Sequence, residues 1–478
     1  MNEILDRRSF SMEDQQRFAR LTGDNNPLHM DPVAARRTQA GVPVVHGLHT
    51  LLWCIDRFAA RHPDVPPIAN VKVRFDRLLR LGESVECVLT RLDDAGFRMD
   101  ADIGGGVGFR LAAAFGARRD PPASESPGAG QEILRPDQPI EVRFEDLAAR
   151  SGRVGFAVPP GELAREFPAA ARQWGERRIA ALACTTRLVG MVCPGLHSIF
   201  GGLTLNFSDG AEDDDALGFR VTATDPRFRV VRQAIAGGGL FGTVESFARL
   251  PPIAQAGVAD LARHVTRDEF RGATALVLGG SRGLGEVTSK LLAAGGAHVV
   301  LTYASGLVEA ERISEEIRRW GGQCDTLRYD VQAPAAEQLA TLAAAPTHLY
   351  YFATSPIFQQ KSGLYARDRF ARFCDFYVDG FYAVCQQLAA RQPGKLSVFY
   401  PSSIAVEKRP PDMTEYAMAK MAGEALCADM NAQWPNVRVT VSRIPRVLTD
   451  QTASVVQVES ADPVDVMLPI VRQVQAAE

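Results

Sequence analysis

Two ionisable side chains close together in the sequence have types suited to acid–base chemistry. Asp24 and His29 lie five residues apart, and Asn25, Asn26 and Pro27, which favour turns, separate them. A short loop of this kind lets a carboxyl group and an imidazole converge on one water molecule or one substrate hydroxyl. The pattern predicts acid–base catalysis without a metal. The alternative is that Asp24 caps a helix or turn and His29 makes only local hydrogen bonds.

These two residues belong to a longer motif, Thr-Gly-Asp-x-Asn-Pro-x-His at 22–29, which a His-Gly pair follows downstream. The motif resembles that of the MaoC-like, (R)-specific enoyl-thioester hydratases and dehydratases of the hotdog fold. The resemblance implies that Asp24 and His29 activate the water added to a 2-enoyl thioester, or protonate the departing hydroxyl in reverse. It also implies that Asn26 orients the loop and that the backbone N–H of Gly47 stabilises the oxyanion.

Elements that would position this loop are visible in the first third of the chain. Helices are expected at about 12–21 and 33–38, on either side of the loop, and a long apolar helix at 47–61. Strand-like runs follow at 68–75, 84–90 and 109–115. A helix cradled by antiparallel strands is the expected shape.

Two landmarks of this region recur in the same order later in the chain. Residues 44–50 resemble 192–198, and the glycine run at 103–106 resembles 235–239. The repeat predicts a second hotdog unit at about 137–262.

The second copy lacks the acid–base motif, because residues 181–190 contain no Asp-x-Asn-Pro-x-His loop. Double-hotdog hydratases pair one working half with one half that shapes the acyl tunnel, and the resemblance gives this copy that supporting role. For His49 and His197 a packed, hydrogen-bonded role is favoured over a catalytic one, whereas for His46 both remain open. A linker rich in Pro, Gly, Ser and charge is expected at 119–136.

The texture of the sequence changes near residue 273. An apolar run at 273–278, typical of a buried parallel strand, leads into a glycine-rich turn and a helical stretch at 286–294. Strand, glycine turn and helix start together indicate a dinucleotide site, although tight turns use glycines as well. The residues predicted to hold the dinucleotide are Gly279, Ser281, Arg282, Gly283, Leu284 and Gly285.

The second strand of this region predicts the cofactor. Residues 298–303 end without an acidic residue for a ribose 2′-hydroxyl, and Arg282 is available for a 2′-phosphate. These features favour NADPH over NADH.

A second set of residues suited to proton transfer lies downstream. Tyr416 and Lys420 are four residues apart, so they share one face of a helix, and Ser403 lies thirteen positions before the tyrosine. The ammonium group is expected to lower the pKa of the phenol and to hold the nicotinamide ribose. A lone pair of this kind would more simply be part of a surface helix face. The combination resembles the short-chain dehydrogenase/reductase family over 273–450.

This second resemblance assigns further roles. It implies that Tyr416 is the general acid, that Ser403 orients the substrate carbonyl and that Lys420 supports both tyrosine and ribose. Asp330 and Val331 would contact adenine, and Thr449 the carboxamide. The chain departs from the family pattern in having Phe352-Ala353-Thr354-Ser355-Pro356 in place of Asn-Ala-Gly, Tyr377 or Asp379 in place of a structural Asn, and Pro445-Arg446 in place of Pro-Gly.

Composition narrows the class of partner. The 478 residues carry a net charge of −3, with 23% charged residues, which indicates neither a nucleic-acid surface nor an acidic tail. The start lacks the apolar core of a signal peptide, and no apolar run is long enough to cross a bilayer, so a cytoplasmic protein is expected. Eight scattered cysteines without Cys-x-x-Cys spacing predict buried thiols, with no disulfide and no metal.

Together these features predict a multidomain chain: an α+β double hotdog followed by an α/β Rossmann-type doubly wound parallel sheet. The domains are placed at 1–118, 137–262 and 263–478, with the linker at 119–136. The expected function is a bifunctional 3-oxoacyl-thioester reductase and (R)-3-hydroxyacyl-thioester dehydratase of fatty-acid-like or polyketide-like biosynthesis.

Two alternatives stay open. One is hydration followed by dehydrogenation in acyl-CoA breakdown, and the other is a non-catalytic acyl- or carrier-binding scaffold. The expected partner is an acyl thioester on CoA or acyl carrier protein, without nucleic acid or membrane, and the family resemblance favours a homo-oligomer.

Overall fold

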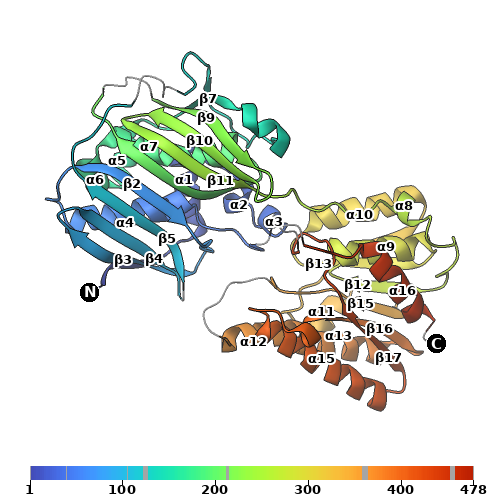
Figure 1. Cartoon of the computed structure of the whole chain (residues 1–478). Coiled ribbons are helices and arrows are strands. Elements are labelled where there is room, and N and C mark those ends of the chain that lie inside the picture. The colour runs from blue at the N-terminus through green and yellow to red at the C-terminus, as the bar shows by residue number, and fades with distance from the viewer. Residues whose placement is uncertain are drawn as a thin grey trace. The chain divides into compact units, whose positions relative to one another are not determined.

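The computed structural model describes residues 2–38, 40–104, 106–121, 127–210, 215–357, 364–452 and 458–476. These residues form two compact units, one ending at Pro251 and the other beginning at Pro252 (Figure 1). Each unit has hydrophobic cores of its own. No helix in the described ranges is both long and apolar enough to span a membrane.

The first half of the first unit is a sheet wrapped around one helix. Its strands are β1 (Glu3–Ser9), β2 (Ile68–Phe75), β3 (Ser84–Asp93), β4 (Gly96–Asp102) and β5 (Val107–Phe115). Its helices are α1 (Met12–Thr22), α2 (Pro27–Met30), α3 (Pro32–Ala35) and α4 (Gly47–Arg61). The central helix α4 has the predicted bounds, and Leu48, Leu51, Leu52, Ile55 and Phe58 form its fully buried face.

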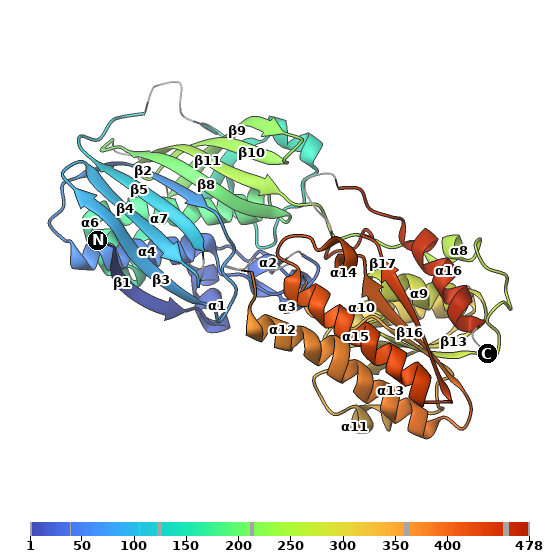
Figure 2. The ribbon, with the colours of Figure 1, turned by 60° about the horizontal axis from the view of Figure 1, so that its bottom comes forward.

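The second half repeats this order of elements. Its strands are β6 (Ile133–Leu134), β7 (Ser151–Gly155), β8 (Ser198–Phe207), β9 (Ala216–Asp225), β10 (Val230–Gly237) and β11 (Leu240–Ala248). Its helical segments are η1 (Phe144–Ala149), α5 (Pro160–Glu166), α6 (Pro168–Trp174), α7 (Glu176–Arg187) and the π-turn η2 (Leu188–Val192). Here α7 takes the central place that α4 has in the first half (Figure 2).

One continuous sheet joins the two halves. Its strand order is β1-β3-β4-β5-β2-β8-β11-β10-β9-β7-β6, so the halves mirror each other about the antiparallel pair β2 and β8. The sheet therefore carries α4 and α7 on one face, and the two helices contact each other. This arrangement places the loop before α4 next to the end of α7.

Of the two segments that repeat in the sequence, only the glycine run occupies equivalent places in the two halves of the structure. The glycine run at 235–239 forms the β10–β11 turn, and 103–106 spans the corresponding β4–β5 turn, although Gly105 lies outside the described residues. Residues 44–50 lead into α4, whereas 192–198 follow η2 and lead into β8. The expectation that these two segments correspond is wrong. The helical path of the second half ends at Val192, where the extended Cys193 follows, and Gly195 has φ +82°, which does not suit the start of a helix like the one at Gly47.

Two further segments differ from the expected layout. The strands β1 and β4 were not expected, although Phe97, Met99 and Ala101 alternate with outward-facing residues on β4. Within the expected linker at 119–136, residues 122–126 lie outside the described ranges. The short strand β6 near its end pairs with β7.

The second unit is built on a six-stranded parallel sheet. Its strands are β12 (Thr274–Leu278), β13 (His298–Tyr303), β14 (Gln323–Arg328), β15 (His348–Tyr351), β16 (Leu396–Ser403) and β17 (Val437–Ile444). The helical segments are α8 (Val258–Leu261), α9 (Gly283–Ala294), α10 (Leu307–Trp320), α11 (Ala335–Leu339), α12 (Arg367–Cys374), the π-turn η3 (Asp375–Asp379), α13 (Gly380–Arg391), α14 (Ala405–Lys408), α15 (Thr414–Gln433) and α16 (Pro463–Gln475).

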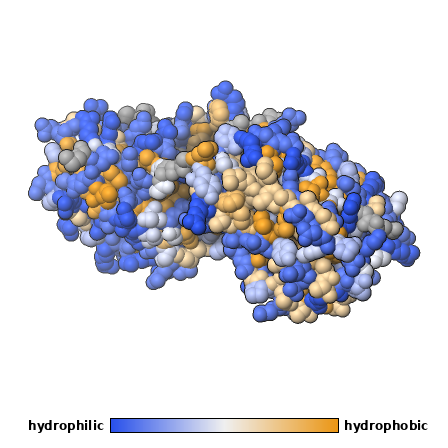
Figure 3. All heavy atoms as spheres, turned by 90° about the horizontal axis from the view of Figure 1, so that it is seen from below, coloured by the Kyte–Doolittle hydropathy of each residue, from blue (hydrophilic) through white to orange (hydrophobic). Residues whose placement is uncertain are grey.

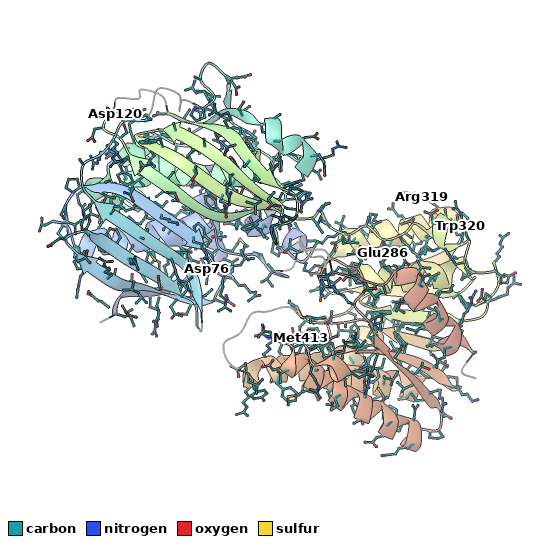
Figure 4. The ribbon with its side chains drawn as sticks, viewed as in Figure 1. Asp76, Asp120, Glu286, Arg319, Trp320 and Met413 are labelled. Atoms are coloured by element: carbon teal, nitrogen blue, oxygen red, sulfur yellow. The ribbon has the colours of Figure 1, made fainter. Side chains whose placement is uncertain are left out.

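The strand order β14-β13-β12-β15-β16-β17 is that of a doubly wound sheet that binds dinucleotides. Val258 and Leu261 of α8, which the sequence places at the end of the second hotdog half, pack in the core of this unit. Close by, the buried Glu286 of α9 (Figure 4) pairs with the buried Lys290 and with the exposed Arg312 of α10. All eight cysteines are free thiols, and seven of them are buried.

Candidate active sites

The loop with the first acid–base motif is shaped by helix caps. The helix α1 ends at Gly23, whose φ of +69° is the left-handed conformation that favours glycine. Three residues later, the Asn26 side chain accepts a hydrogen bond from the Leu28 N–H and so begins α2. Asp24 therefore lies between two helix ends, and His29 lies on the single turn of α2.

The acid and the imidazole converge as the motif predicts. A carboxylate oxygen of Asp24, a ring nitrogen of His29 and a ring nitrogen of His46 lie within 4.8 Å of one another. His29 Nδ1 is 2.8 Å from the carbonyl oxygen of Val44, which fixes the proton on Nδ1. The Nε2 atom of His29 is then left as the proton acceptor.

The carboxylate is held from the second half of the unit. The Thr186 hydroxyl donates to Asp24 Oδ2 at 2.7 Å, and the backbone N–H of Asn26 donates to Oδ1 at 3.2 Å. A Cβ on Gly190 would lie 2.4 Å from Asp24 Oδ1, so only glycine fits there. The Nδ2 atom of Asn26 donates to the Gly190 carbonyl at 2.7 Å. Asn26 thus orients the loop by binding it to the other half.

Residues of both halves line one pocket around this pair. In addition to Asp24 and His29 its wall includes the start of α4 at Gly47 and the polar side chains of Thr50, Arg77, Thr186 and Ser198. Aromatic and aliphatic side chains form most of the rest. Those apolar residues are Leu28, Val45, Phe75, Leu78, Leu79, Ala101, Ile103, Phe109, Val189, Ile199 and Phe200. A pocket with few polar groups in an apolar wall suits an acyl chain.

Burial moves the pKa values of the two ionisable groups toward each other. It raises the pKa of Asp24, although His29 and the Thr186 hydroxyl act in the opposite direction. Burial lowers the pKa of His29, although the neighbouring Asp24 raises it. Groups with converging pKa values exchange protons at small cost, as acid–base catalysis requires.

The other histidines of the unit take different places. His46 is fully buried, and its ring stacks on that of His29 with centroids 3.9 Å apart. His49 stacks on Phe18 in the core, and Nε2 of His197 lies 3.1 Å from Glu141.

The cluster of Asp24, His29 and His46 has a donor set that a metal ion accepts. The two ring nitrogens of His46, however, already lie near the Gln15 side chain, at 3.3 Å, and the Asp24 carbonyl, at 3.1 Å. The absence of a metal from the reaction stays a prediction.

Thr186 and Gly190 are the functional residues that the sequence did not reveal. The one signal in the sequence was the pair Thr185 and Thr186, which places two hydroxyls after the apolar residues of α7. Nothing local connects Thr186 to Asp24, which is 162 positions away.

In the second unit the glycine turn has the shape that a dinucleotide diphosphate needs. Gly279 and Gly283 have φ values of +76° and +56°. A Cβ on Gly285 would lie 2.2 Å from the Gly279 carbonyl oxygen, so the turn is tight against the start of α9. No side chain caps α9 at Arg282, which leaves its first N–H groups for a phosphate.

The other predicted cofactor residues lie near the sheet's carboxyl ends. Thr449 approaches the glycine turn, since a Cβ on Gly283 would lie 3.5 Å from its methyl carbon. Asp330 and Val331 follow β14, and Val331 packs against the first residue of α13. Ser281 is buried and Leu284 is partly buried within the turn and the first turn of α9.

Tyr416 and Ser403 come together, as predicted. Ser403 lies close enough to act on the pKa of Tyr416 and lowers it, but burial outweighs this effect and raises that pKa to about 12. The expected lowering of the phenol pKa by Lys420 is not seen, because burial and Ser403 are the causes that shift this pKa; Nζ of Lys420 lies 5.9 Å from the centre of the Tyr416 ring. Nζ donates to the Pro401 carbonyl at 2.6 Å and lies 3.7 Å from the centre of the Tyr377 ring. Burial lowers the pKa of Lys420 to about 7.

Comparison with known families agrees with both kinds of domain. Residues 4–105 match the MaoC like domain, and residues 273–462 match the short chain dehydrogenase family. The chain joins a MaoC-like domain to a short-chain dehydrogenase domain.

Among curated proteins, 65 residues are 43% identical to the peroxisomal multifunctional enzyme type 2 of Drosophila melanogaster, covering 13% of this chain and 11% of that protein. Another 87-residue match is 42% identical to the 3-hydroxybutyryl-CoA dehydratase of Methylorubrum extorquens, covering 18% and 55%. The chain thus spans about a tenth and about half of these two relatives. A solved 3-oxoacyl (acyl-carrier-protein) reductase from Agrobacterium tumefaciens shares 21% identity, with a TM-score of 0.39, over 44% of this chain and 89% of that one.

The short-chain dehydrogenase domain departs from its family's pattern at the centre of the site. Tyr377 on η3 is fully buried, and its hydroxyl bonds to Thr354 Oγ1. It is one of the two residues, with Asp379, that the sequence offers in place of a structural Asn, and its ring covers the Lys420 ammonium. The site therefore holds its lysine between an aromatic ring and a backbone carbonyl.

Proposed function

We propose that the chain is a bifunctional enzyme of acyl thioesters. Its MaoC-like domain interconverts 2-enoyl and (R)-3-hydroxyacyl thioesters, and its short-chain dehydrogenase domain interconverts 3-hydroxyacyl and 3-oxoacyl thioesters. The observation that carries this proposal is the convergence of Asp24 and His29 in one largely apolar pocket. The name of the related 3-hydroxybutyryl-CoA dehydratase supports a CoA thioester as substrate.

In the MaoC-like domain the acid and the base act as one unit. During dehydration Asp24 and His29 remove the C2 proton and protonate the departing hydroxyl at C3. The Val44 carbonyl keeps the His29 proton on Nδ1, so Nε2 faces the reaction. The Gly47 N–H at the start of α4 stabilises the negative charge that gathers on the thioester oxygen.

In the short-chain dehydrogenase domain the protein positions a carbonyl and supplies a proton. A nicotinamide cofactor, when bound, supplies hydride to C3. The glycine turn and the start of α9 would hold its diphosphate, and the positions of Asp330, Val331 and Thr449 suit contacts with adenine and carboxamide. Tyr416 protonates the carbonyl oxygen, and Ser403, which lies beside Tyr416, orients that oxygen.

We propose NADPH as the cofactor and synthesis as the direction. The strand β13 ends at Tyr303 and no acidic residue directly follows it, while Arg282 lies at the start of α9, where a 2′-phosphate could be met. The reductase product is then the dehydratase substrate. The alternative is the reverse order of reactions, hydration followed by NAD-linked oxidation, which uses the same residues. The similarity to a peroxisomal multifunctional enzyme speaks for this alternative.

Association with a second copy is also proposed. Figure 3 shows apolar side chains gathered on one face of the second unit. The helix α15 also exposes two methionines, Met418 to 37% and Met421 to 42%. A cytoplasmic location stays a prediction.

The two half-reactions can be tested separately. Purified protein should hydrate a short 2-enoyl-CoA and should reduce a short 3-oxoacyl-CoA with NADPH faster than with NADH. Asp24→Asn should stop only hydration, and Tyr416→Phe only reduction. Thioester binding without turnover in the unaltered protein would support the scaffold alternative, and faster turnover with NADH would support breakdown.

A further inference from the structure

One buried hydroxyl in the MaoC-like pocket has no hydrogen-bond partner within the described part of the chain. Thr50 of α4 is 4% exposed, and its Oγ1 contacts no donor or acceptor there. The residue lines the same pocket as Asp24 and His29. Leaving a hydroxyl buried and unpaired costs free energy, so a native protein retains one where something else binds it.

Three other threonines in helices of this chain satisfy their hydroxyls locally. Thr22, Thr185 and Thr288 donate to a backbone carbonyl three or four residues earlier, at 2.8, 2.6 and 2.8 Å. Thr50 lies in a regular helix with carbonyls at the same positions but makes no such bond. The Thr50 side chain lines the pocket, so its unpaired hydroxyl is the group there that a bound molecule could still satisfy.

The position of Thr50 on α4 indicates which atom it meets. It follows Gly47 by three residues, so both lie on one face of the helix. Gly47 is the first helical residue, where backbone N–H groups are unpaired and the helix dipole is positive. A Cβ on Gly47 would lie 2.9 Å from the Phe75 ring, so this approach to the pocket requires glycine. Two donors, one N–H and one O–H, thus border the same wall.

We propose that the Thr50 hydroxyl is a substrate-binding group that donates a hydrogen bond to the carbonyl oxygen of the acyl thioester, beside the Gly47 N–H. This inference rests on the proposed dehydratase function and adds a second donor to its oxyanion site. No proton is transferred, because the hydroxyl only stabilises the charge on oxygen. The substrate satisfies the hydroxyl that the folded protein leaves unpaired.

Two substitutions of Thr50 separate this role from packing. Thr50→Val replaces the hydroxyl with a methyl group of similar size, and Thr50→Ser keeps the hydroxyl. We expect Val to lower kcat for enoyl-CoA hydration about 10²-fold and Ser to keep activity within about threefold. The melting temperature of Thr50→Val should equal or exceed that of the unaltered protein, because an unpaired buried hydroxyl is removed. Thr243→Val, on an outward-facing position of β11, is the matched control.

Kinetics of Thr50→Val within about twofold of the unaltered protein would overturn the proposal, since an oxyanion donor is worth far more. A loss of activity that follows a fall in melting temperature and is not restored by Ser would overturn it as well.

A binding measurement distinguishes this failure from failure of the proposed function. Titration of Asp24→Asn with 3-hydroxybutyryl-CoA, with and without Thr50→Val, measures the contact without turnover, and Val should weaken binding about tenfold. If Thr50→Val weakens binding but the unaltered protein does not hydrate enoyl-CoA, the dehydratase function is refuted and the contact is kept. Hydration by the unaltered protein with unchanged binding would refute the contact alone. Absence of binding by both proteins would refute both.

Discussion

The two halves of the hotdog unit share one order of strands around a central helix but divide the chemistry between them. The first half supplies Asp24 and His29, while the second half supplies Thr186 and Gly190, which hold the carboxylate. None of the residues that the second half adds to the pocket wall is ionisable. A half that adds no ionisable residue to the pocket wall can therefore still set the position and the pKa of the acid in its neighbour.

The largest effect on the hydration rate should follow from changing the half that carries the ionisable residues. Asp24→Asn removes the proton-transferring oxygen but keeps the shape of the side chain, so hydration of a 2-enoyl-CoA should fall roughly 10³-fold. Reduction of a 3-oxoacyl-CoA should be unchanged, because Asp24 belongs to the other domain. Both rates are measured on one preparation. Equal hydration by the Asp24→Asn variant and the unaltered protein would remove Asp24 from the mechanism.

A change on the second half should be nearly as severe. In Gly190→Ala the new methyl group would lie 2.4 Å from Asp24 Oδ1, so the carboxylate must move and hydration should fall about 10²-fold. Gly161→Ala is the matched control, because a Cβ there meets only the Glu176 carboxylate at 3.8 Å. If the two alanine variants hydrated equally well, the second half would not position the acid.

Removing the hydrogen bond between the halves should have a smaller effect and change the pH profile. Thr186→Val deletes the 2.7 Å bond to Asp24 Oδ2, and hydration should fall about tenfold. That bond lowers the pKa of Asp24, so its loss should shift the acidic limb of the rate profile to higher pH. Thr222→Val, exposed on β9, is the control. An unchanged limb would mean that Thr186 does not contact the ionised carboxylate.

The smallest effect concerns the stability of the first half, where His49 is buried on α4. Burial lowers the pKa of His49 to about 3, so the unfolded chain binds a proton below pH 6.5 that the folded chain does not. Above pH 6.5 His49 is neutral in both states and does not lower the free energy of unfolding. As the pH falls below 6.5, protonation of the unfolded chain lowers that free energy, by roughly 2 kcal/mol at pH 5. His49→Phe, which keeps the stacking on Phe18, should flatten the decline of the melting temperature between pH 7 and 5. An equally steep decline would assign the acid sensitivity to other groups.

The sequence predicted those parts of the site whose residues lie close together along the chain. Asp24, Asn26 and His29 share one loop, so their spacing and turn residues predicted the convergence. The helix α4 was predicted to the residue because its apolar periodicity is strong. Thr186 could not be predicted as a partner, since only folding brings it across 162 positions to Asp24.

The second unit shows the same limit. The glycine turn and the Ser403–Tyr416 pair follow local patterns and adopt the expected geometry. The expected effect of Lys420 on the Tyr416 pKa failed, because burial dominates that pKa and the buried Tyr377 ring holds the ammonium. Burial among distant aromatic residues cannot be read from a four-residue spacing.

One coupled reaction tests the bifunctional proposal most directly. The protein is mixed with 3-oxobutyryl-CoA and NADPH, with the Asp24→Asn variant in parallel, and thioester products are followed by mass spectrometry. We predict that the unaltered protein consumes NADPH and forms both 3-hydroxybutyryl-CoA and the enoyl product, and that the variant stops at the 3-hydroxy compound. Equal formation of the enoyl product by both proteins, or no consumption of NADPH, would contradict the proposal.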